Sequence, residues 1–127
     1  MSNKNKRPVF LDLRRIRLPV TAVTSLAHRI SGLVLFLALP FCIYLLDRSL
    51  SGPDGFAVAS SVLDAFAVRL LFVAVLWALA HHILAGIRFL LLDLDWGAAL
   101  PEAVRSARAV NLAGLTVAVL AGGWLLL

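Results

Sequence analysis

Three long apolar runs dominate the pattern of hydrophobic and polar positions along the 127-residue chain. They carry no charge at residues 30–46, 70–87 and 109–127, and the first two continue back to Leu18 and on to Leu92 past a few polar residues. A transmembrane helix needs about 20 mostly apolar residues, and a single segment satisfies its backbone hydrogen bonds in lipid only as a helix. The pattern therefore predicts an all-α integral membrane protein with three transmembrane helices.

Helix-breaking residues predict where these helices begin and end. The expected helices cover residues of about 21–48, 61–93 and 102–127. Pro19 stands where the first helix should begin, and Pro40 inside it predicts a kink, because proline removes one backbone hydrogen bond.

The two expected connections carry their own signals. Residues 47–55 include Ser-Gly-Pro-Asp-Gly, which is typical of a loop. Ser61, with Asp64 three residues later, fits a capping box that opens the second helix. After a connection at residues 93–100, Pro101 followed by Glu102 suits the first turn of the third helix.

Basic residues near the helix ends predict the orientation. The chain has twelve basic residues and a net charge of +5, and six of the twelve precede the first span. These six are Lys4, Lys6, Arg7, Arg14, Arg15 and Arg17. Three more flank the second connection (Arg88, Arg105 and Arg108), against two around the first (Arg48 and Arg69). By the positive-inside rule, residues 1–20 form a cytoplasmic amino-terminal segment, residues 21–127 form the membrane domain, and the carboxyl terminus is periplasmic.

Composition excludes several other classes of protein. Hydrophobic residues make up 61% of the chain, charged residues 15%, and the mean hydropathy is +0.95, which is outside the range of soluble domains. Cys42 is the single cysteine, too few for an iron–sulfur cluster or a structural zinc site. No glycine-rich dinucleotide or phosphate fingerprint occurs, and the basic residues do not form an aromatic-interleaved nucleic-acid surface. Any flavin or iron–sulfur centre must therefore lie on other subunits.

Polar residues inside the first span are candidates for function, because ionisable groups in a bilayer are costly. At 100° per residue, Thr21, Ser25, Arg29 and Gly32 lie on one stripe, with His28 beside it. A hydroxyl, a guanidinium and an imidazole on one face suit a small polar head group or a carboxylate. Two other interpretations stay open: Arg29 snorkels to the interface, and Ser25 bonds back to its own helix.

The second span carries two adjacent histidines. His82 lies roughly 16 Å inside the span, near the midplane. Its neighbours one turn away are Ala78 and Gly86, and two small residues leave the flat gap that a porphyrin needs. His81 has Trp77 at that position, so a macrocycle there would collide with the indole. If one histidine is an axial ligand, we expect it to be His82; alternatively, Ala78 and Gly86 form a helix-packing seam.

These residues resemble the cytochrome b556 subunits of bacterial succinate dehydrogenase over nearly the whole chain. The similar fragments are Arg7-Pro8, Leu11-Asp12-Leu13, Arg17-Leu18-Pro19, Thr21-Ala22, the run from Ser25 to Gly32, and the run from His82 to Arg88 with Asp93 following. Two such fragments, in order on the first two of three helices, are a specific combination. One departure is Phe89, because the family often has a histidine there.

The resemblance implies a membrane anchor subunit of respiratory complex II in the bacterial inner membrane. It implies one haem b in a helical bundle shared with a second small membrane subunit, His82 being this chain's axial ligand to the iron. It also implies that Ser25 and Arg29 contribute to a ubiquinone site, and that His28 and Arg29 lie near the haem propionates. A flavoprotein and an iron–sulfur subunit would dock on the cytoplasmic side, so this chain alone would hold no complete catalytic site.

The implied activity is electron transfer from succinate to ubiquinone, in the respiratory chain and the tricarboxylic acid cycle. Two alternatives stay open at this point. One is an anchor of fumarate reductase, which runs the reaction in the other direction. The other is a membrane adaptor without a cofactor.

Overall fold

The computed structural model describes residues 16–127, and within them the backbone forms four α-helices and no strand. The helices are α1 (Val20–Leu50), α2 (Pro53–Asp64), α3 (Phe66–Asp93) and α4 (Leu100–Leu126). Three of them, α1, α3 and α4, are long and apolar enough to cross a membrane. The predicted all-α membrane fold with three spans is therefore confirmed, while the basic residues before residue 16 lie outside the described part of the chain.

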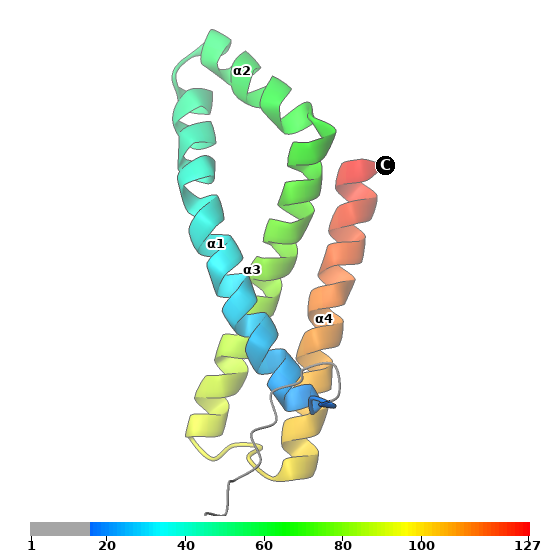
Figure 1. Ribbon diagram of the computed structural model, residues 1–127. Coiled ribbons are helices and arrows are strands. Elements are labelled where there is room, and N and C mark those ends of the chain that lie inside the picture. Colours follow the sequence, from blue (N-terminus) through cyan, green and yellow to red (C-terminus); the bar gives the residue numbers. More distant parts are fainter. Residues whose placement is uncertain (1–15) are drawn as a thin grey trace, which may run out of the picture.

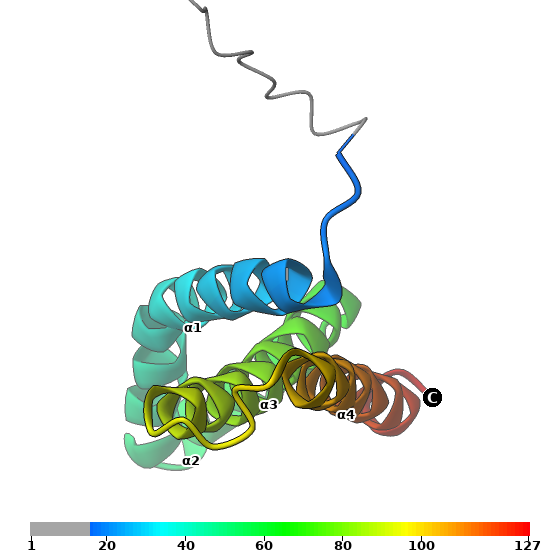
Figure 2. The same ribbon diagram turned by 90° about the horizontal axis from the view of Figure 1, so that it is seen from below.

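The helix α3 is the centre of the bundle, because it contacts both α1 and α4 extensively. Figure 1 shows α1 and α3 crossing, with α4 running beside α3, and the view from below in Figure 2 places α1 and α4 on different sides of α3. The start of α1 and the α3–α4 connection lie at one end of the bundle, and α2 and the carboxyl terminus lie at the other (Figure 1). This arrangement is the one that three consecutive membrane crossings require.

The first span begins where the sequence indicated. Pro19 is the residue immediately before α1 and has an extended backbone, and its carbonyl oxygen accepts bonds from the amides of Ala22 and Val23. The helix then continues through Pro40 to Leu50. The kink expected at Pro40 stays a prediction.

The segment between the first two spans differs from the expected loop, because most of it is helical. Gly52, with φ at 110°, reverses the chain, and Pro53 then occupies the first turn of α2. The capping-box interpretation of Ser61 and Asp64 is wrong: the Ser61 hydroxyl donates to the Val58 carbonyl oxygen at 2.8 Å, inside α2. Glycine followed by proline is the stronger helix-start signal, so the helix forms eight residues earlier than residue 61.

A break at Ala65 separates α2 from the second span. Ala65 has an extended backbone, with φ at −64° and ψ at 127°, and α3 starts at Phe66. The carboxylate of Asp64 pairs across this break with the guanidinium of Arg69 at 2.8 Å. Asp64 therefore joins two helices instead of capping one.

The connection between α3 and α4 agrees with the sequence prediction. A turn follows Asp93, and two residues in it, Asp95 and Gly97, have positive φ values of 60° and 71°. Pro101 and Glu102 lie in the first turn of α4, as expected from proline's fixed φ and the favourable position of an acid there.

Small residues let α3 approach α4 closely, while large apolar residues cover the outside of the bundle. The buried positions of α3 are Ala78, His81, Ala85 and Arg88, and those of α4 are Ala107 and Gly114. Many leucines of all three long helices are exposed, as a lipid or membrane-protein environment allows. The α3–α4 contact therefore buries two polar residues of α3, His81 near the middle of the helix and Arg88 near its end.

Candidate functional site

The crossing of α1 and α3 brings His28 and His82 together. Their imidazole rings are stacked, with centroids 4.1 Å apart and planes inclined by 7°. His28 comes from the third turn of α1 and His82 from the middle of α3. Both side chains are half-buried, so the pair lies at the edge of the bundle and not in its interior.

A glycine of each helix lies at this crossing, and only Gly32 is needed for the close approach. A Cβ added to Gly32 would lie 3.0 Å from Cε1 of His82, which is tighter than nearly all Cβ contacts, so the ring would have to shift by a few tenths of an ångström. A Cβ added to Gly86 would lie 3.6 Å from Nε2 of His28, an ordinary contact. The flat gap expected beside His82 is therefore not open at Gly86, because the imidazole of His28 fills it. Ala78, the other small neighbour, is fully buried on the stripe of α3 that carries His81.

The surroundings of His82 fix which of its ring nitrogens carries the proton. Nδ1 lies 3.1 Å from the carbonyl oxygen of His28 and 3.2 Å from Oγ of Ser31. The Ser31 hydroxyl itself donates to the same carbonyl at 2.8 Å. A carbonyl oxygen only accepts, so we assign the proton of neutral His82 to Nδ1. Nε2 then keeps its lone pair, and within residues 16–127 it has no hydrogen-bond partner.

His81 has the opposite environment. Its side chain is only 2% exposed, and Nε2 lies 3.1 Å from Oδ1 of Asn111 on α4. Its Nδ1 is buried without a partner among the described residues. The Trp77 ring lies 5.6 Å away, as the sequence indicated. A ligand outside the bundle therefore cannot reach His81, whereas Nε2 of His82 is available.

The predicted quinone residues lie on α1 near the same end of the bundle as the histidine pair. Ser25 is half-buried and Arg29 is exposed. Neither hydrogen-bonds through its side chain to another residue in the described part of the chain, so the back-bonded alternative for Ser25 is not found there. Thr24 and Ser31 do bond back to their own helix, to Val20 and His28. Within residues 16–127, Ser25 and Arg29 thus use no side-chain donor.

Phe89 lies about two turns along α3 from His82 and contacts the ring of His28. Its ring meets that of His28 edge-on at 5.2 Å, and the guanidinium of Arg88 lies over its face at 5.4 Å. Arg88 is itself 6% exposed and donates to Ser106 Oγ and the Ala103 carbonyl oxygen, both at 2.9 Å. Arg88 therefore joins α3 to α4, and an apolar ring occupies the place of the expected histidine.

The structure adds polar residues that the sequence reasoning missed. Ser31 contacts the predicted ligand histidine, while Thr24 and Asn111 contact each other at 3.1 Å and form a cluster with His81. A signal was present for Asn111, because an amide inside a transmembrane helix usually hydrogen-bonds to a neighbouring helix. For Ser31 and Thr24 the sequence alone gives only hydroxyls at helical spacing.

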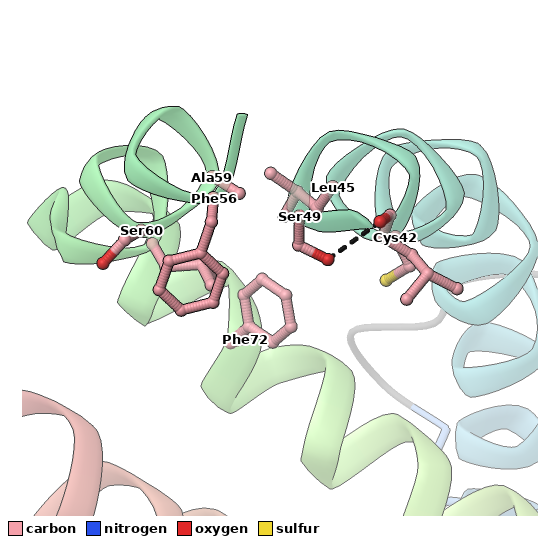
Figure 3. Close-up of a pocket in the computed structure, with 9 residues that line it drawn as sticks. Cys42, Leu45, Ser49, Phe56, Ala59, Ser60 and Phe72 are labelled. Carbon is pink, nitrogen blue, oxygen red and sulfur yellow. Dashed lines mark hydrogen bonds between the residues drawn. The ribbon is translucent and has the colours of Figure 1, made fainter. Parts of the chain in front are cut away.

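A separate cavity of about 310 Å³ lies among α1, α2 and α3 and is lined mainly by apolar residues. Figure 3 shows Phe56 and Phe72 facing Leu45 and Cys42 across it. Cys42 is about 15 Å along α1 from Gly32, so this cavity is remote from the histidine pair. No cluster of three metal-ligating side chains occurs in residues 16–127. The described residues can thus give an iron one histidine, with other ligands coming from elsewhere.

Comparison with known proteins identifies the family of this chain. Residues 3–122 match the family described as succinate dehydrogenase/fumarate reductase transmembrane subunit. The chain belongs to this family. It is 39% identical to the succinate dehydrogenase cytochrome b556 subunit of Coxiella burnetii, over 94% of this chain and 97% of the relative. It is 31% identical to the subunit of the same name from Paracoccus denitrificans, over 93% and 91% of the two chains.

As a succinate dehydrogenase/fumarate reductase transmembrane subunit, the chain is a membrane component of an enzyme complex. Nearly the full length of the relatives is covered, so all three spans take part in the similarity. The resemblance deduced from the histidine and arginine fragments is confirmed at the level of the family.

Proposed function

We propose that this chain is the cytochrome b subunit of a succinate:quinone oxidoreductase, holding haem b and part of the ubiquinone site. The observation that carries the proposal is the geometry of His82. Its Nδ1 donates to a backbone carbonyl and to a buried hydroxyl, and its Nε2 is free. Metal-bound histidines typically donate their other ring N–H in this way, which fixes the ring orientation and makes the ligand more basic.

The donor atoms present fit a haem with one axial ligand from this chain, and the ring of His28 would have to leave the gap at Gly86 for a macrocycle to lie there. His82 would bind the iron through Nε2, and the second axial ligand would come from another membrane subunit, since His81 is enclosed and His28 is stacked on His82. The haem supplies one-electron redox chemistry when bound. What this chain contributes is a rigid, oriented ligand, held by the carbonyl of His28 and the hydroxyl of Ser31.

Two further residues of α1 are proposed to surround the cofactor's acidic groups. His28 lies against His82, and Arg29 follows it in the chain with an exposed side chain. A guanidinium pairs well with a carboxylate, often with two hydrogen bonds. We therefore assign His28 and Arg29 to the neighbourhood of the haem propionates.

We also assign Ser25 and Arg29 to the ubiquinone head group. Ser25 and Arg29 are about one and two turns inside the start of α1, and neither side chain donates a hydrogen bond to another described residue. Negative charge develops on a quinone oxygen as the quinone is reduced, and a guanidinium and a hydroxyl stabilise that charge in a low-dielectric site. The remaining walls of the pocket would come from partner chains.

The proposed partners are a second small membrane subunit, an iron–sulfur subunit and a flavoprotein subunit, in the bacterial inner membrane. The basic residues around the start of α1 and the α3–α4 connection support a cytoplasmic amino terminus and a periplasmic carboxyl terminus. The soluble subunits would then dock beside Ser25. Whether the complex works as succinate dehydrogenase or as fumarate reductase depends on cofactor potentials outside this chain.

Optical spectroscopy on the complex, purified through a tag on this chain, tests the proposal. Spectra of the dithionite-reduced minus the oxidised complex should show a b-type band, and quinone-dependent succinate oxidation should accompany it. An assembled but colourless complex would reject the haem and favour a membrane adaptor. A complex that contains no flavoprotein or iron–sulfur subunit would reject the assignment of partners.

A further inference from the structure

The side of α3 that carries His81, about 100° around the helix from His82, holds a buried hydrogen-bond network that the proposed function does not use. Oδ1 of Asn111 on α4 lies 3.1 Å from Nε2 of His81 on α3 and 3.1 Å from Oγ1 of Thr24 on α1. Thr24 is fully buried, and its hydroxyl also lies 3.0 Å from the Val20 carbonyl oxygen. The single hydroxyl proton of Thr24 can go to the Val20 carbonyl oxygen or to Oδ1 of Asn111, and Oδ1 contacts side chains of both other transmembrane helices at one level of the bundle.

The network fixes the protonation of His81. With the Asn111 amide assigned so that Oδ1 faces His81, the proton of His81 lies on Nε2, because an amide oxygen accepts and does not donate. Its Nδ1 is then a bare lone pair, buried with no donor in residues 16–127. The imidazole of His81 is thus held in the network by one hydrogen bond, from Nε2–H to Oδ1 of Asn111, and its Nδ1 makes none.

Close packing makes this contact rigid. A Cβ added to Gly114 of α4 would lie 3.3 Å from both Cβ and Cδ2 of His81. Two turns further along the same stripe, Arg88 donates to Ser106 Oγ and the Ala103 carbonyl oxygen. The α3 helix is therefore attached to α4 at two points about 10 Å apart, which opposes both rotation about its axis and sliding.

Consecutive residues of a helix differ in direction by about 100°, so a rotation of α3 moves His81 and His82 together. We propose that Asn111, with Thr24, is a positioning residue for the haem ligand: it holds His81, and thereby sets the direction of His82. This inference rests on the proposed function. When the hold is released, α3 can rotate and the bond from His82 Nδ1 to the His28 carbonyl oxygen, now 3.1 Å, lengthens. A weaker bond makes the ligand less basic and stabilises the oxidised iron less, so the haem potential rises.

The test measures the haem midpoint potential and the low-spin ferric electron paramagnetic resonance signal of the purified complex. Asn111→Leu and His81→Leu should each retain haem but raise its midpoint potential by up to about 59 mV. For one electron, that shift corresponds to a tenfold lower affinity for the oxidised haem relative to the reduced haem. Thr24→Val should shift the potential the same way by less. Thr116→Val is the matched control, because the Thr116 hydroxyl also bonds back to its own helix, to Leu112 at 2.9 Å, but on the exposed face. It should leave the potential and the signal unchanged.

His81→Gln separates a hydrogen-bond donor from an imidazole. The glutamine amide nitrogen takes approximately the place of Nε2 and can still donate to Asn111, while nothing replaces Nδ1. This variant should therefore keep the wild-type potential. The inference is wrong if the potential of His81→Gln shifts as that of His81→Leu does. It is also wrong if the leucine variants lose haem while the remaining haem keeps the wild-type potential and resonance signal. Should the leucine variants not assemble, an unshifted potential in Thr24→Val overturns the network. A wild-type complex without haem overturns the proposed function as well.

Discussion

The imidazoles of His28 and His82 lie parallel, 4.1 Å apart, at the point where α1 and α3 cross. Each helix contributes a histidine and, close to the other helix's histidine, a glycine: Gly32 of α1 lies against His82, and Gly86 of α3 lies against His28. The crossing is reciprocal but not equally tight. A Cβ added at Gly32 would lie only 3.0 Å from the His82 ring, whereas one added at Gly86 would make an ordinary contact of 3.6 Å with His28.

This asymmetry leads to a first prediction about alanine at the two glycines. Gly32→Ala should displace the His82 ring and lower haem content or stability, because overpacking costs about 1–3 kcal/mol. Gly86→Ala should be tolerated much better. Gly122→Ala is the control, since nothing lies within 4 Å of its added Cβ. Haem per complex and thermal stability are the measurements, and equal losses at Gly32 and Gly86 would contradict the account.

The three spans could be predicted from the sequence because lipid imposes a length and an apolar composition on any crossing helix. The helix α2 was missed because Gly52 and Pro53 were interpreted as part of a loop, although glycine before proline also begins a helix. The break at Ala65 has no proline or glycine that would have indicated it.

The site was predictable to a different extent for each residue. His82 could be separated from His81 because Trp77 lies beside His81. The roles of Ser31 and Asn111 depend on which side chains of other helices lie opposite them, and helical periodicity within one segment does not determine that. The gap expected at Gly86 was misjudged for the same reason, because the ring of His28 comes from another helix.

A second prediction concerns the quinone site. Arg29→Leu and Ser25→Ala should lower quinone reduction, Arg29→Leu by more, because each loses a donor to an oxygen that becomes negative. A hydrogen bond to a charged group contributes about 1.5–3 kcal/mol, or about ten- to a hundredfold in rate if it acts in the transition state. Succinate oxidation with an artificial acceptor that takes electrons before the quinone should survive in both.

The same helix provides matched controls for that experiment. Arg48→Leu changes an arginine near the other end of α1, and Ser49→Ala removes a hydroxyl that bonds back to Leu46. Both should leave quinone reduction at the wild-type rate. If Arg29→Leu also turns over quinone normally in an intact complex, the quinone site lies elsewhere.

A third prediction concerns orientation in the membrane. A reporter that is active only in the periplasm should be silent when fused after Arg17 and active when fused after Asp54 or at the carboxyl terminus. The physical reason is the excess of basic residues before the first span and around the second connection. The inverse activity pattern would reverse the orientation and move the docking side of the soluble subunits.

The central claim is that His82 is this chain's ligand to the haem iron, and spectra of two adjacent variants test it most directly. In His82→Ala the free Nε2 is removed, so the reduced-minus-oxidised spectrum and the low-spin ferric resonance signal should lose the character of two histidine ligands, even if some haem is retained. In His81→Ala the buried contact to Asn111 is lost, but the iron should keep its ligand, and both histidine-type signals should persist, although the potential shifts. Unchanged spectra in His82→Ala together with lost histidine ligation in His81→Ala would contradict the account.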